Sequence, residues 1–431
     1  MLHDNIAINE QGHLTFAGQD TVALAKTYGT PLYLLDENRI RARMRLYKNE
    51  MKACFGGESG PLFAGKSICF KGMYRIAKEE GIGIDVVSPG ELYTAKSAGF
   101  PMERAFFHGN NKTDADIAFA MDAGVGTFVS DSKEELDQID RTAKEKGIVQ
   151  NVLLRLSPGI DPHTFAAVNT GKVDSKFGFA IATGQAEEAV AHALSLSNVK
   201  LLGFHCHIGS QIFESKPFCD AADVMMRFIA NMSKRFHTPF PVLNLGGGFG
   251  VKYVESDPEL DFASVIRAIA IHVRTLSDTL SVPMPCIFME PGRSIVADAG
   301  MTLYTVGTTK TITGYKNYVS VDGGMPDNPR YALYGSKYTF YVANKANETA
   351  DFECTIAGRC CESGDLLGEN VLLPRPVRGD ILATAVTGAY NYAMASNYNR
   401  LPRPALVRLF DGKHELAVRR ETYEDLIRLD L

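Results

Sequence analysis

The chain has 431 residues, which is too long for one ordinary hydrophobic core and predicts two domains. Its composition, 45% hydrophobic and 22% charged, is typical of a soluble globular protein, and a formal net charge of −5 leaves no basic excess for binding nucleic acid or an anionic membrane. No apolar run is long enough to span a bilayer, the first residues lack the pattern of a signal peptide, and the eight cysteines form no CxxC pair. We therefore expect free thiols and a cytoplasmic enzyme.

Residues 1–30 are typical of strands and turns, and PLYLLD (residues 31–36) predicts a further strand followed by a charged helix. Eight short apolar runs then follow, of which the first four begin 22 residues apart and the later ones at intervals of 24 to 49. A strand and a returning helix need this much chain, so the pattern predicts eight parallel strand–helix units that close into a (β/α)8 TIM barrel. The runs are PLFAGKS from Pro61, GIDVVS from Gly83, AFFHGN from Ala105, TFVSD from Thr127, NVLLRLS from Asn151, KLLGFHCHIGS from Lys200, VLNLGGG from Val242 and CIFMEPG from Cys286.

The last third of the chain has a different pattern. Helical periodicity disappears, and short β-rich runs such as KNYVSVDGG and DILATAVTG alternate with turn dipeptides such as Asp411-Gly412. The sequence thus predicts an α/β protein with a barrel over residues 31–297 and an all-β domain, a β-sandwich or β-barrel, over residues 298–431. We expect residues 1–30 to join the β domain.

Most of the eight runs end in residues that can do chemistry. The active site of such a barrel lies at the C-terminal ends of its strands, so these residues are candidates for one site. They are Lys66, Ser88, His108, Asp131, Arg155, His207, Gly246 to Gly248 and Glu290. His108, Asp131 and Arg155 receive no specific role.

Lys66 ends the first run, next to Gly65 and two apolar residues. Burial in a barrel lowers the pKa of an ammonium group, which makes a lysine a competent Schiff-base amine. The alternative is a surface lysine at the end of a strand.

Two motifs near the last strands indicate anion binding. Exposed backbone N–H groups of Gly246, Gly247 and Gly248 are able to cradle a phosphate, although a tight turn that needs positive φ is the alternative. The run Glu290-Pro-Gly292-Arg293 combines a carboxylate and a cation, which would hold a heterocyclic nitrogen and an anion; the alternative is a local ion pair.

His205 and His207 alternate with Cys206, so both histidines are expected on one side of a strand. They suggest a zinc pair, but no third ligand lies at metal spacing, and we expect no metal ion. An imidazole stacked on an aromatic ring, with Ser210 donating to an anion, fits the other motifs better.

Two motifs of the β domain carry reactive groups. Cys361 and Glu362, in CCESGD, combine a thiol with a carboxylate in a turn. Arg330 and Tyr334, in PRYALY, are four residues apart and are expected to converge on one carboxylate. The alternatives are a polar turn and a surface loop.

Taken together and in this order, the motifs resemble those of the fold-type III pyridoxal-phosphate-dependent decarboxylases, and among them most closely the diaminopimelate decarboxylases. The resemblance runs from about residue 31 to the C-terminus, and HIGSQ, EPGR, CESGD and GAY with a later SNYN are jointly specific. One departure is visible, since the family usually has RPALY where this chain has RYALY, with Tyr331 directly after Arg330. The spacing from Arg330 to Tyr334 is preserved.

The resemblance implies a cofactor, pyridoxal 5′-phosphate, bound by residues of the barrel. Lys66 would form the Schiff base, His207 would stack on the pyridine ring and Glu290 would bond the ring nitrogen. The further cofactor-binding residues would be Asp85, Ser210, Gly246, Gly247, Gly248, Gly292, Arg293 and Tyr390.

The resemblance also implies the substrate contacts and the assembly. Cys361 would be the proton donor, Glu362 would bind the distal amino group, and Arg293, Arg330, Tyr334 and Tyr390 would bind the rest of the substrate. In this family the CESGD loop enters the site of the partner subunit, so a homodimer with shared active sites is implied.

The expected reaction is decarboxylation of meso-2,6-diaminopimelate to L-lysine and CO2, the last step of lysine biosynthesis. A carboxylate such as Glu290 keeps the ring nitrogen protonated, whereas racemases of this fold place an arginine there and weaken the electron sink. Two alternatives stay open. One is a relative that acts on another basic amino acid or a carboxylated polyamine (ornithine, lysine or carboxynorspermidine), and the other is a non-catalytic homologue that binds pyridoxal phosphate.

Overall fold

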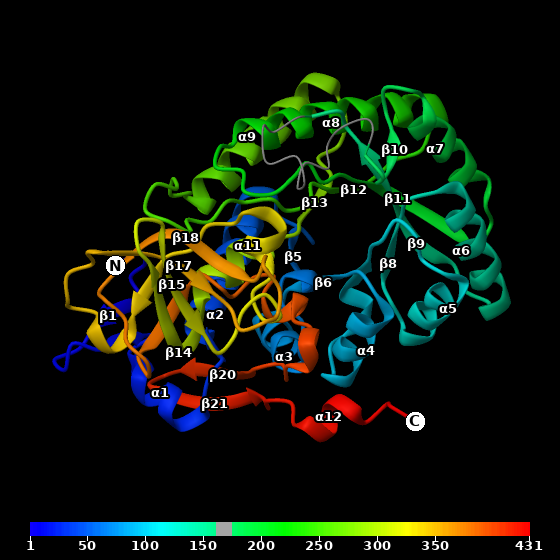
Figure 1. Ribbon diagram of the computed structural model, residues 1–431. Helices are drawn as coiled ribbons and strands as arrows, with labels where there is room; N and C mark the ends of the chain where they lie inside the picture. The colour runs from blue at the N-terminus through cyan, green and yellow to red at the C-terminus, as the bar shows by residue number, and fades with distance from the viewer. Residues whose placement is uncertain (161–174) are drawn as a thin grey trace. The chain divides into compact units, whose positions relative to one another are not determined.

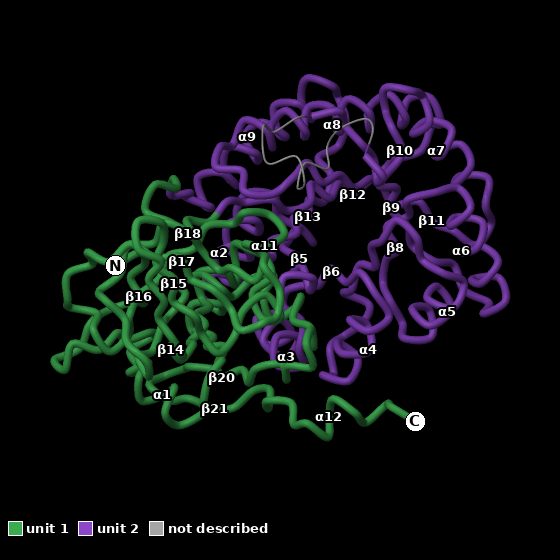
Figure 2. Tube along the Cα trace, viewed as in Figure 1, with its two compact units in different colours: residues 1–41, 251–258, 293–431 green, residues 42–250, 259–292 purple. Residues whose placement is uncertain are grey.

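The structure is a computed structural model and describes residues 1–160 and 175–431 (Figure 1). The chain divides into two compact units. Unit 1 comprises residues 1–41, 251–258 and 293–431, and unit 2 comprises residues 42–250 and 259–292 (Figure 2). Within the described ranges, no helix is both long and apolar enough to cross a lipid bilayer.

Unit 2 is a closed barrel of eight parallel strands, which confirms the predicted fold class (Figure 1). Each of the eight apolar runs forms one strand. The strands are β5 (Gly60–Ala64), β6 (Gly83–Val86), β7 (Ala105–Phe107), β8 (Thr127–Ser130), β9 (Gln150–Ser157), β11 (Val199–His205), β12 (Val242–Asn244) and β13 (Cys286–Met289). The ring closes because β9 pairs with both β8 and β11 while β13 pairs with β5. A short additional strand, β10 (Phe179–Ala180), also pairs with β9.

Helices connect the barrel strands, and local sequence explains several of their ends. The side chains of Ser88, Thr113 and Ser132 accept backbone N–H groups at helix N-termini, and Gly81 and Gly147 end helices in the left-handed conformation. The helices are α2 (Glu37–Phe55), α3 (Lys71–Glu80), α4 (Pro89–Ser97), α5 (Asp114–Ala123), α6 (Lys133–Lys146), α7 (Gln185–Ser195), α8 (Lys216–Phe236) and α9 (Phe262–Leu280).

The barrel interior is filled by a layer of apolar side chains from different strands. Leu62, Phe106, Val129 and Leu153 are buried in one cluster, against which Leu202, Val242 and Phe288 pack. The rings of Phe106 and Phe288, from β7 and β13, lie 5.0 Å apart between centroids. This layer closes the middle of the barrel, so that polar side chains gather beyond it at the strand ends.

Unit 1 contains a mostly antiparallel sheet in the order β18-β17-β15-β14-β4-β20-β21, with β19 paired to β14 and β16 paired to β19. A separate three-stranded sheet is formed by the N-terminal residues. The strands of unit 1 are β1 (Ile6–Ile8), β2 (Leu14–Phe16), β3 (Gln19–Asp20), β4 (Leu32–Asp36), β14 (Gly300–Ile312), β15 (Lys316–Val321), β16 (Phe340–Val342), β17 (Phe352–Ala357), β18 (Leu366–Leu373), β19 (Ile381–Ala385), β20 (Ala405–Phe410) and β21 (Lys413–Val418). Its helices are α1 (Thr21–Tyr28), α10 (Arg293–Val296), α11 (Arg330–Tyr334) and α12 (Tyr423–Ile427).

The barrel was expected to begin at residue 31, but the structure places β4 (Leu32–Asp36) in unit 1. All five residues of β4 are buried, and a buried strand needs hydrogen-bonding partners along both edges. β14 supplies one edge as an antiparallel neighbour and β20 supplies the other as a parallel neighbour. Residues 31–41 therefore belong to unit 1, as does the segment 251–258 that follows β12.

Candidate active site

Polar side chains follow the apolar layer of the barrel at the carboxyl ends of its strands. Successive residues of a strand alternate between faces, so the residue two positions after an interior residue also faces the interior. His108 stands in this relation to Phe106, Asn244 to Val242 and Glu290 to Phe288. His205, whose strand has a register shift after Leu201, pairs in register with Asn244.

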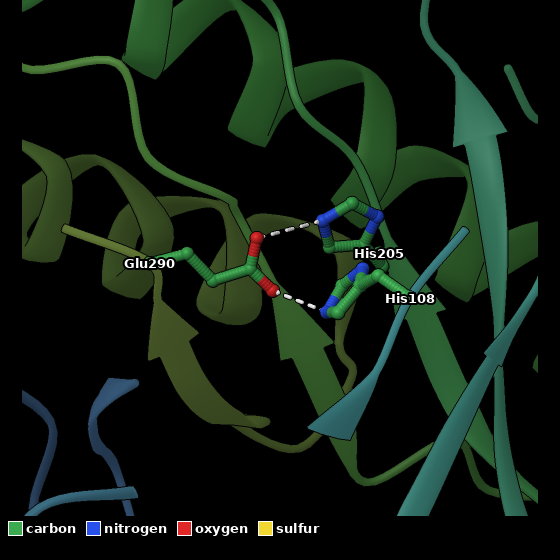
Figure 3. A group of neighbouring side chains, drawn as sticks. All are labelled: His108, His205 and Glu290. Carbon is green, nitrogen blue, oxygen red and sulfur yellow. Dashed lines mark hydrogen bonds and ion pairs between the residues drawn. The ribbon is translucent and has the colours of Figure 1, made fainter. Parts of the chain in front are cut away.

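Glu290 contacts the other residues of this group, and Figure 3 shows its carboxylate facing His108 and His205. Its side chain is buried, Asn244 Nδ2 donates to Oε1 at 2.7 Å, and His205 Nε2 lies 3.2 Å from Oε2. His108 Nε2 lies 2.8 Å from Oε1 without the angle of a regular hydrogen bond, so we treat that contact as electrostatic. Burial alone would raise the pKa of Glu290, but the two histidines outweigh it and hold that pKa well below its ordinary value. Burial lowers the pKa of His205 to about 4, so a neutral histidine faces an ionised carboxylate at neutral pH.

Asp85, at the end of β6, is a second buried carboxyl group at this place. Its Oδ1 atom lies 3.7 Å from His108 Nε2 and has no hydrogen-bond partner among the described residues. Burial raises the pKa of Asp85, and the neighbouring Glu290 raises it further, whereas His108 and Lys66 lower it. Two buried acids therefore share the environment of one histidine.

Lys66 lies in a short 3-10 helix, η1 (Gly65–Ser67), directly after β5. It is exposed rather than buried, because the residue follows the end of the strand and is not one of its interior positions. Its charge acts on three neighbours. It contributes, after burial, to the low pKa of His207, and it opposes the rise in the pKa values of Asp85 and Glu91.

The glycine turn after β12 is closely packed. Gly246 and Gly248 have φ of 68° and 118°, and a Cβ atom on Gly246 would lie 2.5 Å from the carbonyl oxygen of Cys206. A Cβ atom on Gly247 would lie 2.2 Å from the carbonyl oxygen of Glu290. These close contacts are sufficient to explain why glycine is needed at these positions. Phosphate binding by the turn therefore remains a prediction. Gly292 is similarly close to the Lys66 turn, with a Cβ position 2.9 Å from Ala64 Cβ.

These residues of unit 2 fit a cationic heterocycle such as a protonated pyridine ring. An ionised carboxylate offers about four acceptor positions, and the contacts of Glu290 with Asn244, His108 and His205 use three of them. The remaining position and the unpartnered Asp85 Oδ1 are buried acceptors that a ring N–H group would satisfy. The expectation of no metal considered only His205 and His207. The structure instead groups His205 with His108 and Glu290 as three potential ligands. In this structure the two histidines contact the Glu290 carboxylate directly.

Unit 1 contains a second polar cluster, which is built around two buried arginines. Arg293 Nη1 donates to the hydroxyl of Tyr253 at 2.7 Å, and its guanidinium lies 4.8 Å from the ring centre of Tyr390. Arg330 Nη1 donates to the hydroxyls of Tyr338 at 3.1 Å and Tyr253 at 3.4 Å. No acidic side chain among the described residues contacts Arg330, which is only 7% exposed. A buried guanidinium surrounded by phenols is suited to bind a carboxylate.

Arg330 and Tyr334, which were expected to converge on one carboxylate, lie at the two ends of one short helix. Arg330 begins the five-residue helix α11 and is buried, whereas Tyr334 ends that helix and is 46% exposed. Tyr253 and Tyr338 take the place beside Arg330. Tyr253 follows the glycine turn by three residues in GGGFGVKY, which was the available signal in the sequence; no motif marks Tyr338.

Cys361 and Glu362 are exposed on a loop of unit 1 whose backbone is held by side chains. The Cys361 N–H donates to Asn399 Oδ1 at 2.8 Å. The buried carboxylate of Asp365 accepts the N–H groups of Cys360 and Met325 at 2.7 and 2.6 Å. These bonds fix the loop that presents the thiol and the carboxylate.

The remaining strand-end residues form a separate pair. Arg155 Nε lies 3.9 Å from Asp131 Oδ1, and the Arg155 guanidinium lies 4.2 Å from the ring centre of Phe177. Ser210 is half-buried in the loop after β11.

Comparisons with known proteins identify the family. The family description "Pyridoxal-dependent decarboxylase, pyridoxal binding domain" matches residues 37–297. A diaminopimelate decarboxylase of Bacillus subtilis is 45% identical over 430 residues, which cover 100% of this chain and 98% of the relative. A crystal structure of diaminopimelate decarboxylase from M. jannaschii with L-lysine superposes with a TM-score of 0.92 at 34% identity and covers 100% of this chain and 99% of that one. The corresponding Helicobacter pylori complex with L-lysine has a TM-score of 0.86 at 30% identity and covers 95% of this chain and 99% of that one.

The family that the motifs predicted is thereby confirmed, and with it the dependence on pyridoxal phosphate. The roles of individual residues remain predictions. The chain belongs to the diaminopimelate decarboxylase family of pyridoxal-dependent decarboxylases.

Proposed function

We propose that the protein decarboxylates meso-2,6-diaminopimelate to L-lysine and CO2. The observation that carries this proposal is the buried, ionised Glu290 at the barrel end. A carboxylate at this position favours a protonated ring nitrogen, and when bound, pyridoxal phosphate supplies an electron sink for the electron pair that CO2 leaves behind. An arginine in place of Glu290 would instead suit racemisation.

Residues of the barrel, together with Arg293 and Tyr390 of unit 1, would hold the cofactor. Lys66 would bind its aldehyde carbon covalently, Glu290 would keep the ring nitrogen protonated and His207 would face the ring. Burial and the Lys66 charge lower the pKa of His207, so a neutral imidazole is available for stacking at neutral pH. The further residues that would hold the cofactor are Asp85, Ser210, Gly246, Gly247, Gly248, Gly292, Arg293 and Tyr390.

Residues of unit 1 would bind the substrate and complete the reaction. Diaminopimelate ends in an ammonium and a carboxylate, so its distal end needs an acid and a bidentate cation. Glu362 would bind the ammonium, and Arg330 would bind the carboxylate, supported by its burial without an acidic partner among the described residues. The Cys361 thiol would then deliver a proton to the α-carbon.

The decisive experiment is CO2 release from a substrate panel with added pyridoxal phosphate. The proposal predicts that meso-diaminopimelate is the preferred substrate over L-lysine, L-ornithine and carboxynorspermidine. Faster release from one of the others would replace the substrate assignment. A cofactor absorbance band that is unaffected by Lys66→Ala would instead support the non-catalytic alternative.

We further propose a homodimer whose active sites are shared and which works in the cytoplasm. The exposed loop of Cys361 and Glu362 and the eight free cysteines support these two points. Mixing unfolded Lys66→Ala and Cys361→Ala variants and refolding them together tests the sharing. If each site takes the two residues from different subunits, the mixture should recover about a quarter of the wild-type activity, since half of the dimers would contain one intact site. No recovery would mean that each site uses one chain alone.

A further inference from the structure

His108 is a buried residue of the barrel end for which the family resemblance gave no role. It follows β7, is 3% exposed, and its backbone N–H donates to the Val86 carbonyl at 2.9 Å. Its ring contacts the ring of His205 edge-on, with centroids 4.7 Å apart. The residue is therefore fixed at its backbone and contacted at its ring.

The position of Nε2 relates His108 to both buried acids. It lies 2.8 Å from Glu290 Oε1 and 3.7 Å from Asp85 Oδ1 (Figure 3 shows the former contact). Two carboxylates that both lie close to one N–H donor repel each other when both are ionised, and a shared proton is the usual result. A histidine N–H group near both acids offsets that repulsion.

The other neighbours of Glu290 do not contact both acids as His108 does. Asn244 donates to Oε1, but its amide is neutral and its own Oδ1 accepts the Gly246 N–H at 2.9 Å. His205 contacts Oε2 and, among the described residues, makes no contact with Asp85. Arg155 acts on both acids electrostatically, without a hydrogen bond to either.

We propose that His108 is a positioning residue that keeps Glu290 ionised beside Asp85, so that Glu290 can receive the protonated ring nitrogen of the cofactor. This inference rests on the proposed function of the site. Without His108, Asp85 and Glu290 would share one proton, and the partner of the ring nitrogen would be lost for part of the time.

The test uses full-length protein loaded with pyridoxal phosphate labelled with 15N in the ring. The 15N chemical shift reports whether the ring nitrogen is protonated, and a titration of cofactor-free protein gives the cofactor affinity. His108→Phe removes the donor but keeps an aromatic ring, whereas His108→Gln keeps an N–H donor near the position of Nε2. His192→Gln is the matched control, because His192 Nε2 makes a 2.7 Å contact with the Asp137 carboxylate on the barrel surface.

We expect His108→Phe to shift the 15N signal toward that of the unprotonated ring and to weaken cofactor affinity about tenfold, the loss of one close electrostatic contact with Glu290. His108→Gln should restore most of both properties, and His192→Gln should match the wild type. Adding Asp85→Asn to His108→Phe should move the signal back toward the protonated ring, because the repulsion is removed. This double variant also separates a charge effect from poor folding.

A wild-type signal and affinity in His108→Phe would overturn the inference, as would an equal loss in His108→Gln. If Asp85→Asn brings no recovery, repulsion between the acids is not the cause and the inference fails. If the wild-type protein itself binds no pyridoxal phosphate, the proposed function fails instead.

Discussion

Arg330 provides the sharpest test of substrate recognition, through the substitution Arg330→Met. Arg330 is 7% exposed, and its guanidinium contacts the hydroxyls of Tyr253 and Tyr338, with no acidic partner among the described residues. A bidentate pair with the distal carboxylate would contribute two charge-assisted hydrogen bonds, about 3 to 4 kcal/mol in total. The loss of that pair corresponds to a roughly 100- to 1,000-fold lower kcat/KM for meso-diaminopimelate.

The same substitution should leave the substrate-free protein about as stable as before. A buried charge without a counter-ion is costly, and an apolar side chain of similar size removes that cost while it fills the same space. The Tyr338 hydroxyl keeps a partner, because it also donates to Asn391 Oδ1 at 3.3 Å. We expect the midpoint of thermal unfolding to stay within about 3 °C of the wild type.

Steady-state CO2 release and thermal unfolding of the holoenzyme measure the two effects. Arg330→Lys is the matched control, because it keeps the charge but not the planar fork, and its kcat/KM should fall between those of the other two proteins. An Arg330→Met variant with kcat/KM within threefold of the wild type would refute the carboxylate role. A variant that loses activity only because it unfolds would show that Arg330 is structural.

Three further predictions concern other parts of the chain. Asn399→Gly keeps the left-handed backbone (φ 51°) but removes the acceptor of the Cys361 N–H, so kcat should fall about tenfold with unchanged unfolding temperature; a wild-type kcat would contradict this. Gly246→Ala would bring a methyl group 2.5 Å from the Cys206 carbonyl oxygen, so it should lower both the unfolding temperature and the cofactor affinity. Circular dichroism measures the unfolding temperature, and titration with pyridoxal phosphate measures the affinity. Burial raises the pKa of Asp327 to about 7, so the native state retains a proton that the unfolded chain releases above about pH 4, and stability should fall as pH rises from about 4 to about 7. In Asp327→Asn the fall between urea midpoints at about pH 5 and about pH 7 should be smaller; an equal fall in both proteins would contradict that reasoning.

The barrel and the residues at its strand ends were predictable from local sequence. Apolar runs and the helices between them recur along the chain, so eight strands and their order follow without any long-range information. Since parallel strands end at the same edge, Lys66 and Glu290 were also expected at one place. Glycine at Gly246 was predictable too, although the close carbonyl that requires it was not.

What only the tertiary structure decided depends on contacts between distant segments. Leu32 of β4 pairs with Leu303 and Ala405, and nothing in PLYLLD indicates these partners, because alternation and propensity describe a strand but not its neighbours. The same holds for Arg330 among its tyrosines, and for His108 between two acids from other strands. Local sequence specifies which side chains a strand end carries, whereas burial, charge state and partner are set by packing, which no local pattern encodes.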